Sequence, residues 1–118
     1  MSENAPTVEV QRKGDVTQAN LLLSEILDEM TIAEFSDAIN ALVQENKPIR
    51  LLLNFAQVEH LSSSALGTLI RVEKSIKQDE GDFALCGIQE TLFTVFKITK
   101  LDEIFTIYKD VEDALENF

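Results

Sequence analysis

Three consecutive hydroxyl groups, at Ser62, Ser63 and Ser64, form the strongest candidate site for chemistry in this sequence. They stand in the segment Leu61-Ser62-Ser63-Ser64-Ala65-Leu66-Gly67, where a loop passes into an amphipathic helical pattern. A hydroxyl at a helix N-cap accepts a hydrogen bond from an otherwise unpaired backbone amide, and this structural role accounts for one serine. The functional alternative is a phosphate acceptor, because a phosphate there would meet free amides and the positive end of the helix dipole. The residues alone leave both interpretations open.

The other reactive residue types form no catalytic or metal-binding pattern. His60 is the only histidine and Cys86 the only cysteine, which are too few ligands for a zinc site. The segment around Ser63 lacks the flanking glycines of a nucleophile elbow, and the four glycines of the chain are too isolated for a phosphate-binding loop. Cys86 lies among apolar residues, where we expect a buried, inert thiol. We therefore expect a protein that is not an enzyme and that carries no metal and no cofactor.

Length and charge favour a single domain that binds another protein. The chain has 118 residues, and 10 Lys and Arg against 21 Asp and Glu give a formal charge of -11. This charge disfavours nucleic acid and anionic membranes, and it favours a protein partner with a basic face. No apolar run is long enough for membrane insertion, and the first residues do not have the pattern of a signal peptide. With only one cysteine, the sequence indicates a reducing compartment, and we expect a cytoplasmic protein.

The spacing of apolar residues predicts helices that alternate with strands. Apolar residues recur at helical spacing after Thr31 and after Ser64, whereas the continuous apolar run over 50–55 is typical of a strand covered on both faces. Thr31 and Glu34 form a capping-box pattern, which predicts that the first helix begins at Thr31, after an acidic loop. The expected elements, in order, are strands over 8–12 and 16–23 joined by a turn at 13–15, a helix over 31–46, a strand over 50–55, a helix over 64–78, a strand over 83–88, a helix over 90–97, a strand over 104–107 and a helix over 110–117.

The element order ββαβαβαβα predicts an α/β fold with a mixed, mostly parallel sheet of about five strands and about four helices. We expect one domain over residues 8–118, preceded by a short flexible end over residues 1–7. Right-handed crossovers make the later strands parallel, and the opening hairpin adds an antiparallel edge. In such sheets the functional loops gather at the carboxyl ends of the parallel strands. The loops over 28–31 and 59–64 are therefore the expected functional surface.

The sequence resembles the STAS domain family, which includes the anti-sigma factor antagonists. The family motif Asp-Ser-Ser/Thr-Gly-Leu-Gly maps onto residues 62–67, which read Ser-Ser-Ser-Ala-Leu-Gly. The run over 51–55 is similar to the central strand of the family, and 27–29 is similar to its Leu-Asp segment after the second strand. Residues 85–88 and 96–105 resemble its last strands and third helix, so that the resemblance spans about residues 8–118 and implies a STAS-like domain.

The resemblance also implies an anti-sigma factor antagonist that works as a switch. The unmodified domain would bind an anti-sigma factor that is itself a serine-protein kinase, and phosphorylation of the matching serine, Ser63, would release that partner. A PP2C-type phosphatase is a further expected partner. Asp28 matches an acidic family residue near the acceptor, where it would contact the partner or orient the serine. The expected partner-binding residues are Asp28, Glu29, Thr31, Ser62, Ser63, Ser64 and Gly67.

Three departures from the family pattern keep a second function open. Ser62 stands where phosphorylated members usually carry Asp, Asn54 replaces an Asp common at the strand end, and Ala65 replaces the usual Gly. Family members that are not phosphorylated act as plain interaction scaffolds. The alternative expectation is therefore a STAS interaction or scaffold module without phosphorylation, in a stress-signalling complex or as an accessory to transport.

Overall fold

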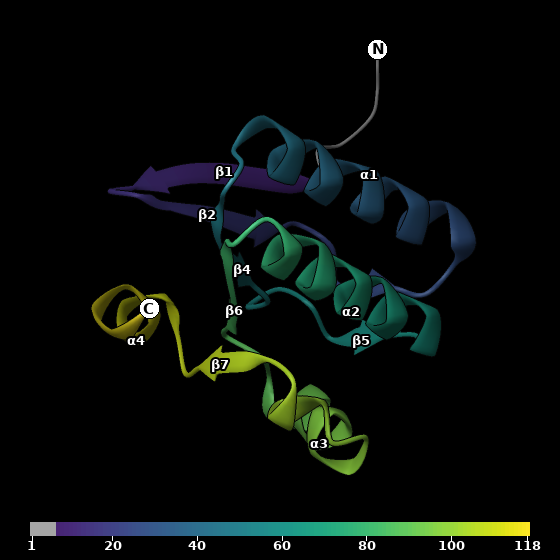
Figure 1. Ribbon diagram of the computed structural model, residues 1–118. Coiled ribbons are helices and arrows are strands. Elements are labelled where there is room, and N and C mark those ends of the chain that lie inside the picture. Colours follow the sequence, from purple (N-terminus) through teal and green to yellow (C-terminus); the bar gives the residue numbers. More distant parts are fainter. Residues whose placement is uncertain (1–6) are drawn as a thin grey trace.

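The computed structural model describes residues 7–118, which form a five-stranded sheet, a small second sheet and four α-helices (Figure 1). The strand order of the large sheet is β1-β2-β4-β6-β7, with β1 antiparallel to β2 and every other neighbouring pair parallel. The small sheet pairs β3 with β5 in parallel. The elements are β1 (Val8–Lys13), β2 (Val16–Leu21), β3 (Glu25–Ile26), α1 (Glu29–Glu45), β4 (Arg50–Asn54), β5 (His60–Leu61), α2 (Ser63–Gln78), β6 (Asp82–Cys86), α3 (Glu90–Ile98), the 3-10 helix η1 (Leu101–Glu103), β7 (Thr106–Tyr108) and α4 (Val111–Asn117).

The predicted fold class is confirmed, since the five-stranded, mostly parallel sheet and the four helices are all present in the expected order. The flexible end expected over residues 1–7 lies outside the described residues except for Thr7. The carbonyl of Thr7 accepts a hydrogen bond from the Leu22 amide at 3.0 Å, which continues the opening hairpin beyond β1.

The predicted start of the first helix is wrong. Helix α1 begins at Glu29, with Asp28 as its N-cap, and the Thr31 amide donates to Asp28 Oδ2 at 3.2 Å. The Thr31 hydroxyl donates to Asp28 Oδ1 at 2.6 Å, so Thr31 supports the cap instead of forming it. Both residue types are favourable at N-caps. Asp28 takes the position because its carboxylate accepts from both groups of Thr31.

Three further local details differ from the expectation. The hairpin turn has two residues between the paired Lys13 and Val16, with Gly14 at a positive φ of 65°. The last strand begins at Thr106, because the amides of Ile104 and Phe105 both bond to the carbonyl of Leu101 and so close the η1 turn. The short strands β3 and β5 were not expected.

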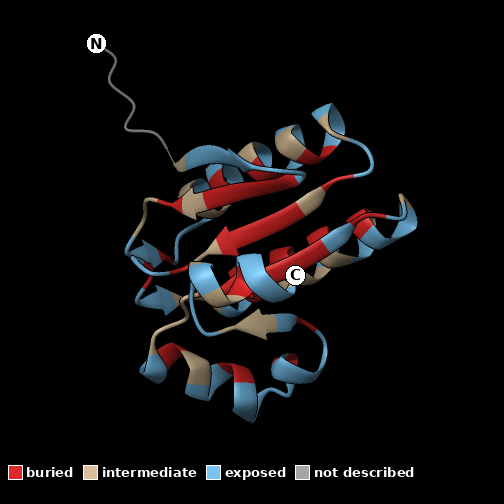
Figure 2. Ribbon diagram, turned by 90° about the vertical axis from the view of Figure 1, so that its left-hand side faces the viewer, coloured by how far each residue is buried: buried red, intermediate tan, exposed pale blue. Residues whose placement is uncertain are grey.

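The sheet is covered on both faces, but unequally. Helices α1, α2 and α3 pack on one face around a large core that includes the fully buried Phe35, Phe55 and Phe96. Helix α4 lies on the opposite face, in front of the strands in Figure 2, over a smaller core that includes Leu52 and Cys86. Burial, with a smaller effect of Asp110, raises the pKa of the Cys86 thiol to about 12, so the thiol stays protonated at neutral pH and is inert as expected.

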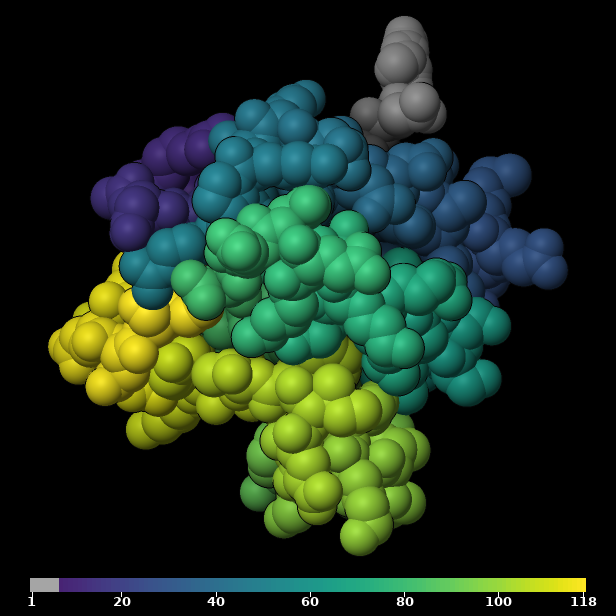
Figure 3. All heavy atoms as spheres, viewed as in Figure 1, coloured from purple at the N-terminus to yellow at the C-terminus, as the bar shows by residue number. Residues whose placement is uncertain are grey.

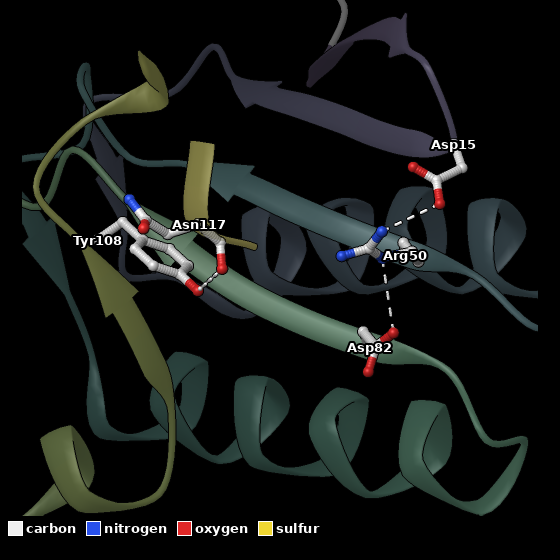
Figure 4. Close-up of polar contacts among 5 residues, drawn as sticks. All are labelled: Asp15, Arg50, Asp82, Tyr108 and Asn117. Carbon is white, nitrogen blue, oxygen red and sulfur yellow. Dashed lines mark hydrogen bonds and ion pairs between the residues drawn. The ribbon is translucent and has the colours of Figure 1, made fainter. Parts of the chain in front are cut away.

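Arg50 joins three elements at the end of the sheet where β4 begins (Figure 4). Its guanidinium lies 3.0 Å from Asp15 Oδ2 and 3.5 Å from Asp82 Oδ2, and it stacks 4.9 Å from the ring centre of Phe118. The hydrogen bond and charge of Arg50 lower the pKa of Asp15. The Tyr108 hydroxyl donates to the carbonyl of residue 117 at 3.1 Å. The contacts of Arg50 with Phe118 and of Tyr108 with residue 117 hold the end of α4 over the second face.

No helix in the described part of the chain combines the length and the apolar character needed to cross a membrane.

Candidate functional site

The small sheet brings the two predicted loops together. In the parallel pairing of β3 with β5, Ile26 lies opposite Leu61, and the Ser62 amide donates to the Ile26 carbonyl at 3.1 Å. Ile26 is fully buried, which anchors this pair to the core. Since Asp28 follows Ile26 by two residues and Ser63 follows Leu61 by two residues, α1 and α2 begin side by side. Figure 1 shows both helices starting at the same side of the molecule, and in Figure 3 the blue atoms of α1 and the teal atoms of α2 adjoin on that side.

We call the exposed area at these two helix N-termini the helix-start surface. It includes Leu27, Met30 and the first residue of each helix, together with the predicted site residues of both loops. The predicted residues that the structure places there are Asp28, Glu29, Thr31, Ser62, Ser63 and Ser64. Gly67 lies one turn further along α2 and is half-buried.

The three serines have different positions on α2. Ser62 is the N-cap, because its Oγ accepts a hydrogen bond from the Ala65 amide at 3.1 Å. Ser63 and Ser64 are the first two helical residues and are exposed, and their hydroxyls make no side-chain hydrogen bond within residues 7–118. The first intrahelical bond runs from the Leu66 amide to the Ser62 carbonyl, so the amides of Ser63 and Ser64 have no intrahelical acceptor. The arrangement is two free hydroxyls, of Ser63 and Ser64, beside the two free amides of the same residues.

Replacing Ser62 by alanine should lower the free energy of unfolding by about 1 kcal/mol, because the Ala65 amide then loses its acceptor. Ser62→Asp should keep the stability of the original chain, because aspartate is an equally good N-cap and stands where the family usually carries it. Urea denaturation of the three proteins measures both effects. A Ser62→Ala protein as stable as the original would show that the cap contributes nothing.

The helix-start surface is strongly acidic. Residues 24–31 and 59–66 contain Glu25, Asp28, Glu29 and Glu59 and no Lys or Arg, and all four carboxylates are exposed. The hydroxyl and then the amide of Thr31 bond to Asp28 and lower the pKa of its carboxyl. Asp28 is therefore ionised at neutral pH. Such a surface attracts a basic partner.

The helix-start surface also has exposed apolar side chains, which were not predicted from the sequence. Met30 is 72% exposed and Leu27 is 46% exposed, so they flank Asp28 with apolar area. A separate groove of about 170 Å³ lies beside Leu61 and is also lined by Val95 on α3. The exposure of Met30 could have been predicted from its spacing, because it stands four residues before Glu34 and seven before Asp37, on the polar face of α1. That prediction requires the helix to begin at Glu29, so that Met30 is part of it.

Asn54, one of the departures from the family pattern, has a structural role at the end of β4. Its Nδ2 donates to Asn20 Oδ1 at 2.9 Å, and its Oδ1 accepts from the Ala56 amide at 3.1 Å. A carboxylate accepts hydrogen bonds but cannot donate one when ionised. The amide therefore makes one contact here that an ionised aspartate could not make.

These observations define a small α/β domain with an acidic, partly apolar surface where two helices begin. Residues 7–114 match the STAS domain, and the chain belongs to this family. The expected resemblance is thereby confirmed.

Relatives and solved structures of this family match the chain, some over most of its length and others over part of it. The chain is 26% identical over 109 residues to the anti-sigma-B factor antagonist of Listeria monocytogenes, and the alignment covers 92% of this chain and 93% of that protein. A 67-residue alignment at 37% identity with the TM1081 homolog of Thermotoga neapolitana covers 57% of this chain and 59% of that protein. The structure of an anti-sigma-factor antagonist (STAS) domain protein from Planctomyces limnophilus has a TM-score of 0.80 and 28% identity, and covers 92% of this chain and 94% of that one. The roles of the individual site residues remain predictions.

Proposed function

We propose that this domain is an anti-sigma factor antagonist, which binds an anti-sigma factor through the helix-start surface and is released when Ser63 is phosphorylated. The names of the Listeria and Planctomyces relatives support the class of partner. The observation that carries the proposal is the pairing of β3 with β5, because it puts the exposed Ser63 hydroxyl on the same surface as Asp28.

The unmodified surface suits a partner that is basic and partly apolar. Four carboxylates attract the partner over several ångströms, which raises the rate of encounter. Exposed apolar side chains, of which Met30 is the most accessible, then supply area that is buried on docking. The partner is expected to carry Lys or Arg around an apolar pocket.

Phosphorylation of Ser63 would weaken the complex because it adds negative charge where the two proteins are in close contact. For the transfer, Ser63 Oγ must face the terminal phosphate of ATP on the partner kinase; the new Oγ–P bond forms as the bond to ADP breaks, and the hydroxyl proton passes to a base of the kinase. The product is a phosphoserine with a charge of about -1.5 to -2, which faces the phosphates of the bound ADP. The negative charges of the phosphoserine and of ADP repel each other when they are this close together, so the complex dissociates. The free amides of Ser63 and Ser64 can hold the phosphate on the helix end without refolding the domain.

The proposal is tested with the purified chain, an anti-sigma kinase from the same genome and a nucleotide. With ATP, mass spectrometry should find phosphate on Ser63, and no label should appear on Ser63→Ala. In calorimetry with ADP present, Ser63→Asp should bind at least about 10-fold more weakly, because its carboxylate approaches the nucleotide phosphates. Ser75→Asp is the matched control, since it adds the same charge roughly 18 Å further along α2.

Two results would contradict the switch. One is phosphate found only at other residues, and the other is a Ser63→Asp protein that binds as tightly as the original chain. Equal binding by the original, Ser63→Ala and Ser63→Asp proteins would instead support the interaction module without phosphorylation. Ser62 and Ala65, which depart from the family motif, are the observations that motivate this alternative.

Replacing Met30 by alanine should weaken binding of the same partner by about 10-fold while leaving the free energy of unfolding within about 0.5 kcal/mol. Met30 is 72% exposed, so its loss removes area from the docking surface and little from the core. Ile98→Ala is the control, because Ile98 is 75% exposed at the end of α3. A partner that loses the same affinity with both variants, or with neither, does not dock at Met30.

A further inference from the structure

Among residues 7–118, strand β1 is an edge of the large sheet, and no strand in this range pairs with its outer side. It pairs with β2, lies outermost in Figure 1, and is exposed from Glu9 to Lys13. The bond from the Leu22 amide to the Thr7 carbonyl sets the alternation of this antiparallel ladder. By this alternation, residues 9, 11 and 13 direct their backbone groups toward β2, and residues 8, 10 and 12 direct theirs outward.

We propose that β1 pairs antiparallel with β1 of a second copy of this chain, with Glu9 of each copy opposite Lys13 of the other. The pairing joins two five-stranded sheets into one sheet of ten strands, which is within the usual size of open sheets. This inference does not depend on the proposed function.

Symmetry restricts the possible registers. Two antiparallel copies of one strand are related by a two-fold axis perpendicular to the sheet, so each face of one sheet continues into the same face of the other. Residues that lie opposite one another then have side chains on the same face, and their numbers differ by an even amount. Glu9 and Lys13 meet this condition: they pair with Asn20 and Val16 of β2 and project from the same face of the sheet.

Charge selects one of the allowed registers. With Glu9 opposite Lys13, two ion pairs form, Val10 lies opposite Arg12, and the two Gln11 residues meet on the axis. In this register Glu9 and Lys13 form pairs without backbone hydrogen bonds, where facing side chains are closest. A shift of one copy by two residues in one direction removes both ion pairs, and in the other direction it sets two Arg12 residues against each other. A shift by four residues sets two Glu9 residues against each other in the first direction and two Lys13 residues against each other in the second.

The same charges explain why the occupant is a second copy. Strand β1 carries one acidic residue, Glu9, and two basic residues, Arg12 and Lys13, so it is self-complementary in a chain that otherwise repels its own copies with a charge of -11. Glu9 also accepts a hydrogen bond from Asn20 Nδ2 at 3.1 Å, which holds its carboxylate on the face where the ion pairs would form.

The test is sedimentation velocity on the full chain over a concentration series. The original chain should form a dimer, and Glu9→Lys and Lys13→Glu should each weaken the dimer by roughly 30-fold, because each variant turns both attractive pairs into repulsive ones. An equimolar mixture of the two variants should form a heterodimer, since Lys faces Glu at both positions again. The double variant E9K/K13E should dimerise like the original chain.

The recovery in the mixture and in the double variant excludes misfolding as the cause of any loss. A chain that stays monomeric at every concentration overturns the proposal. It is equally overturned by a dimer that neither single variant weakens, because such a dimer uses another surface.

Discussion

Replacing Phe55 by alanine should lower the free energy of unfolding by about 3–5 kcal/mol. Phe55 is fully buried directly after β4, in the large core under α1 and α2. The smaller side chain loses the transfer free energy of the ring and leaves a cavity that the surrounding helices cannot fill. Urea denaturation measures the change.

The same variant should loosen the helix-start surface. The Phe55 amide donates to the Cys86 carbonyl at 2.9 Å, and the Phe55 carbonyl accepts from the Val58 amide at 2.9 Å. Alanine can make the same backbone bonds, but without the buried ring the segment that leads to β5 loses the packing that fixes it. Hydrogen exchange of the Ser62 amide, which bonds to Ile26 across the small sheet, should become faster. Val95→Ala is the control, because a side chain that is 38% exposed should change stability by less than about 0.5 kcal/mol. A loss below about 1.5 kcal/mol for Phe55→Ala would contradict the assigned packing.

Replacing Gly81 by alanine should cost about 3 kcal/mol of stability, because there is no space for a Cβ atom at this position. An added Cβ would lie 2.5 Å from the Ile49 carbonyl oxygen and 2.9 Å from Ile76 Cγ2. The first neighbour is backbone, and it is held in place because it accepts from the Asp82 amide at 2.8 Å. The turn between α2 and β6 therefore has to shift, which disturbs the pairing of β4 with β6.

Gly67→Ala is the matched control for this prediction and should have the opposite sign. An added Cβ at Gly67 would meet only the flexible end of Arg71, at 3.7 Å, and an alanine inside a helix is favoured over glycine by about 0.5–1 kcal/mol. Thermal or urea unfolding of both variants in one series measures the two changes in the free energy of unfolding. Equal effects of the two substitutions would show that the close approach at Gly81 does not exist.

Stability and interaction depend on different residues of this domain. Phe55 and Gly81 act on the core and on a tight turn, whereas Ser63 and Met30 lie exposed at the helix-start surface. Glu9 and Lys13 act at the sheet edge.

The long elements were predictable because each carries its own signal along the chain. The apolar run over 50–55 and the helical spacing after Ser64 are local patterns, and both correspond to elements of the structure, β4 and α2. The strands β3 and β5 have two residues each, which is too short for any periodicity, and they form because the segments after β2 and β4 meet at one end of the sheet. The start of α1 was missed since Asp28 and Thr31 both suit an N-cap, and only their mutual hydrogen bonds distinguish them.

The α/β class, the order of the main elements, the acidic charge and the hydroxyl-rich start of α2 were predictable from residue types and from spacing along single segments of the chain. The folded arrangement was needed to show that Ser62 is the cap and Ser63 is free, that Asp28 shares their surface, and that Met30 is exposed. Those facts depend on backbone direction and on contacts between segments more than thirty residues apart, which no local pattern encodes.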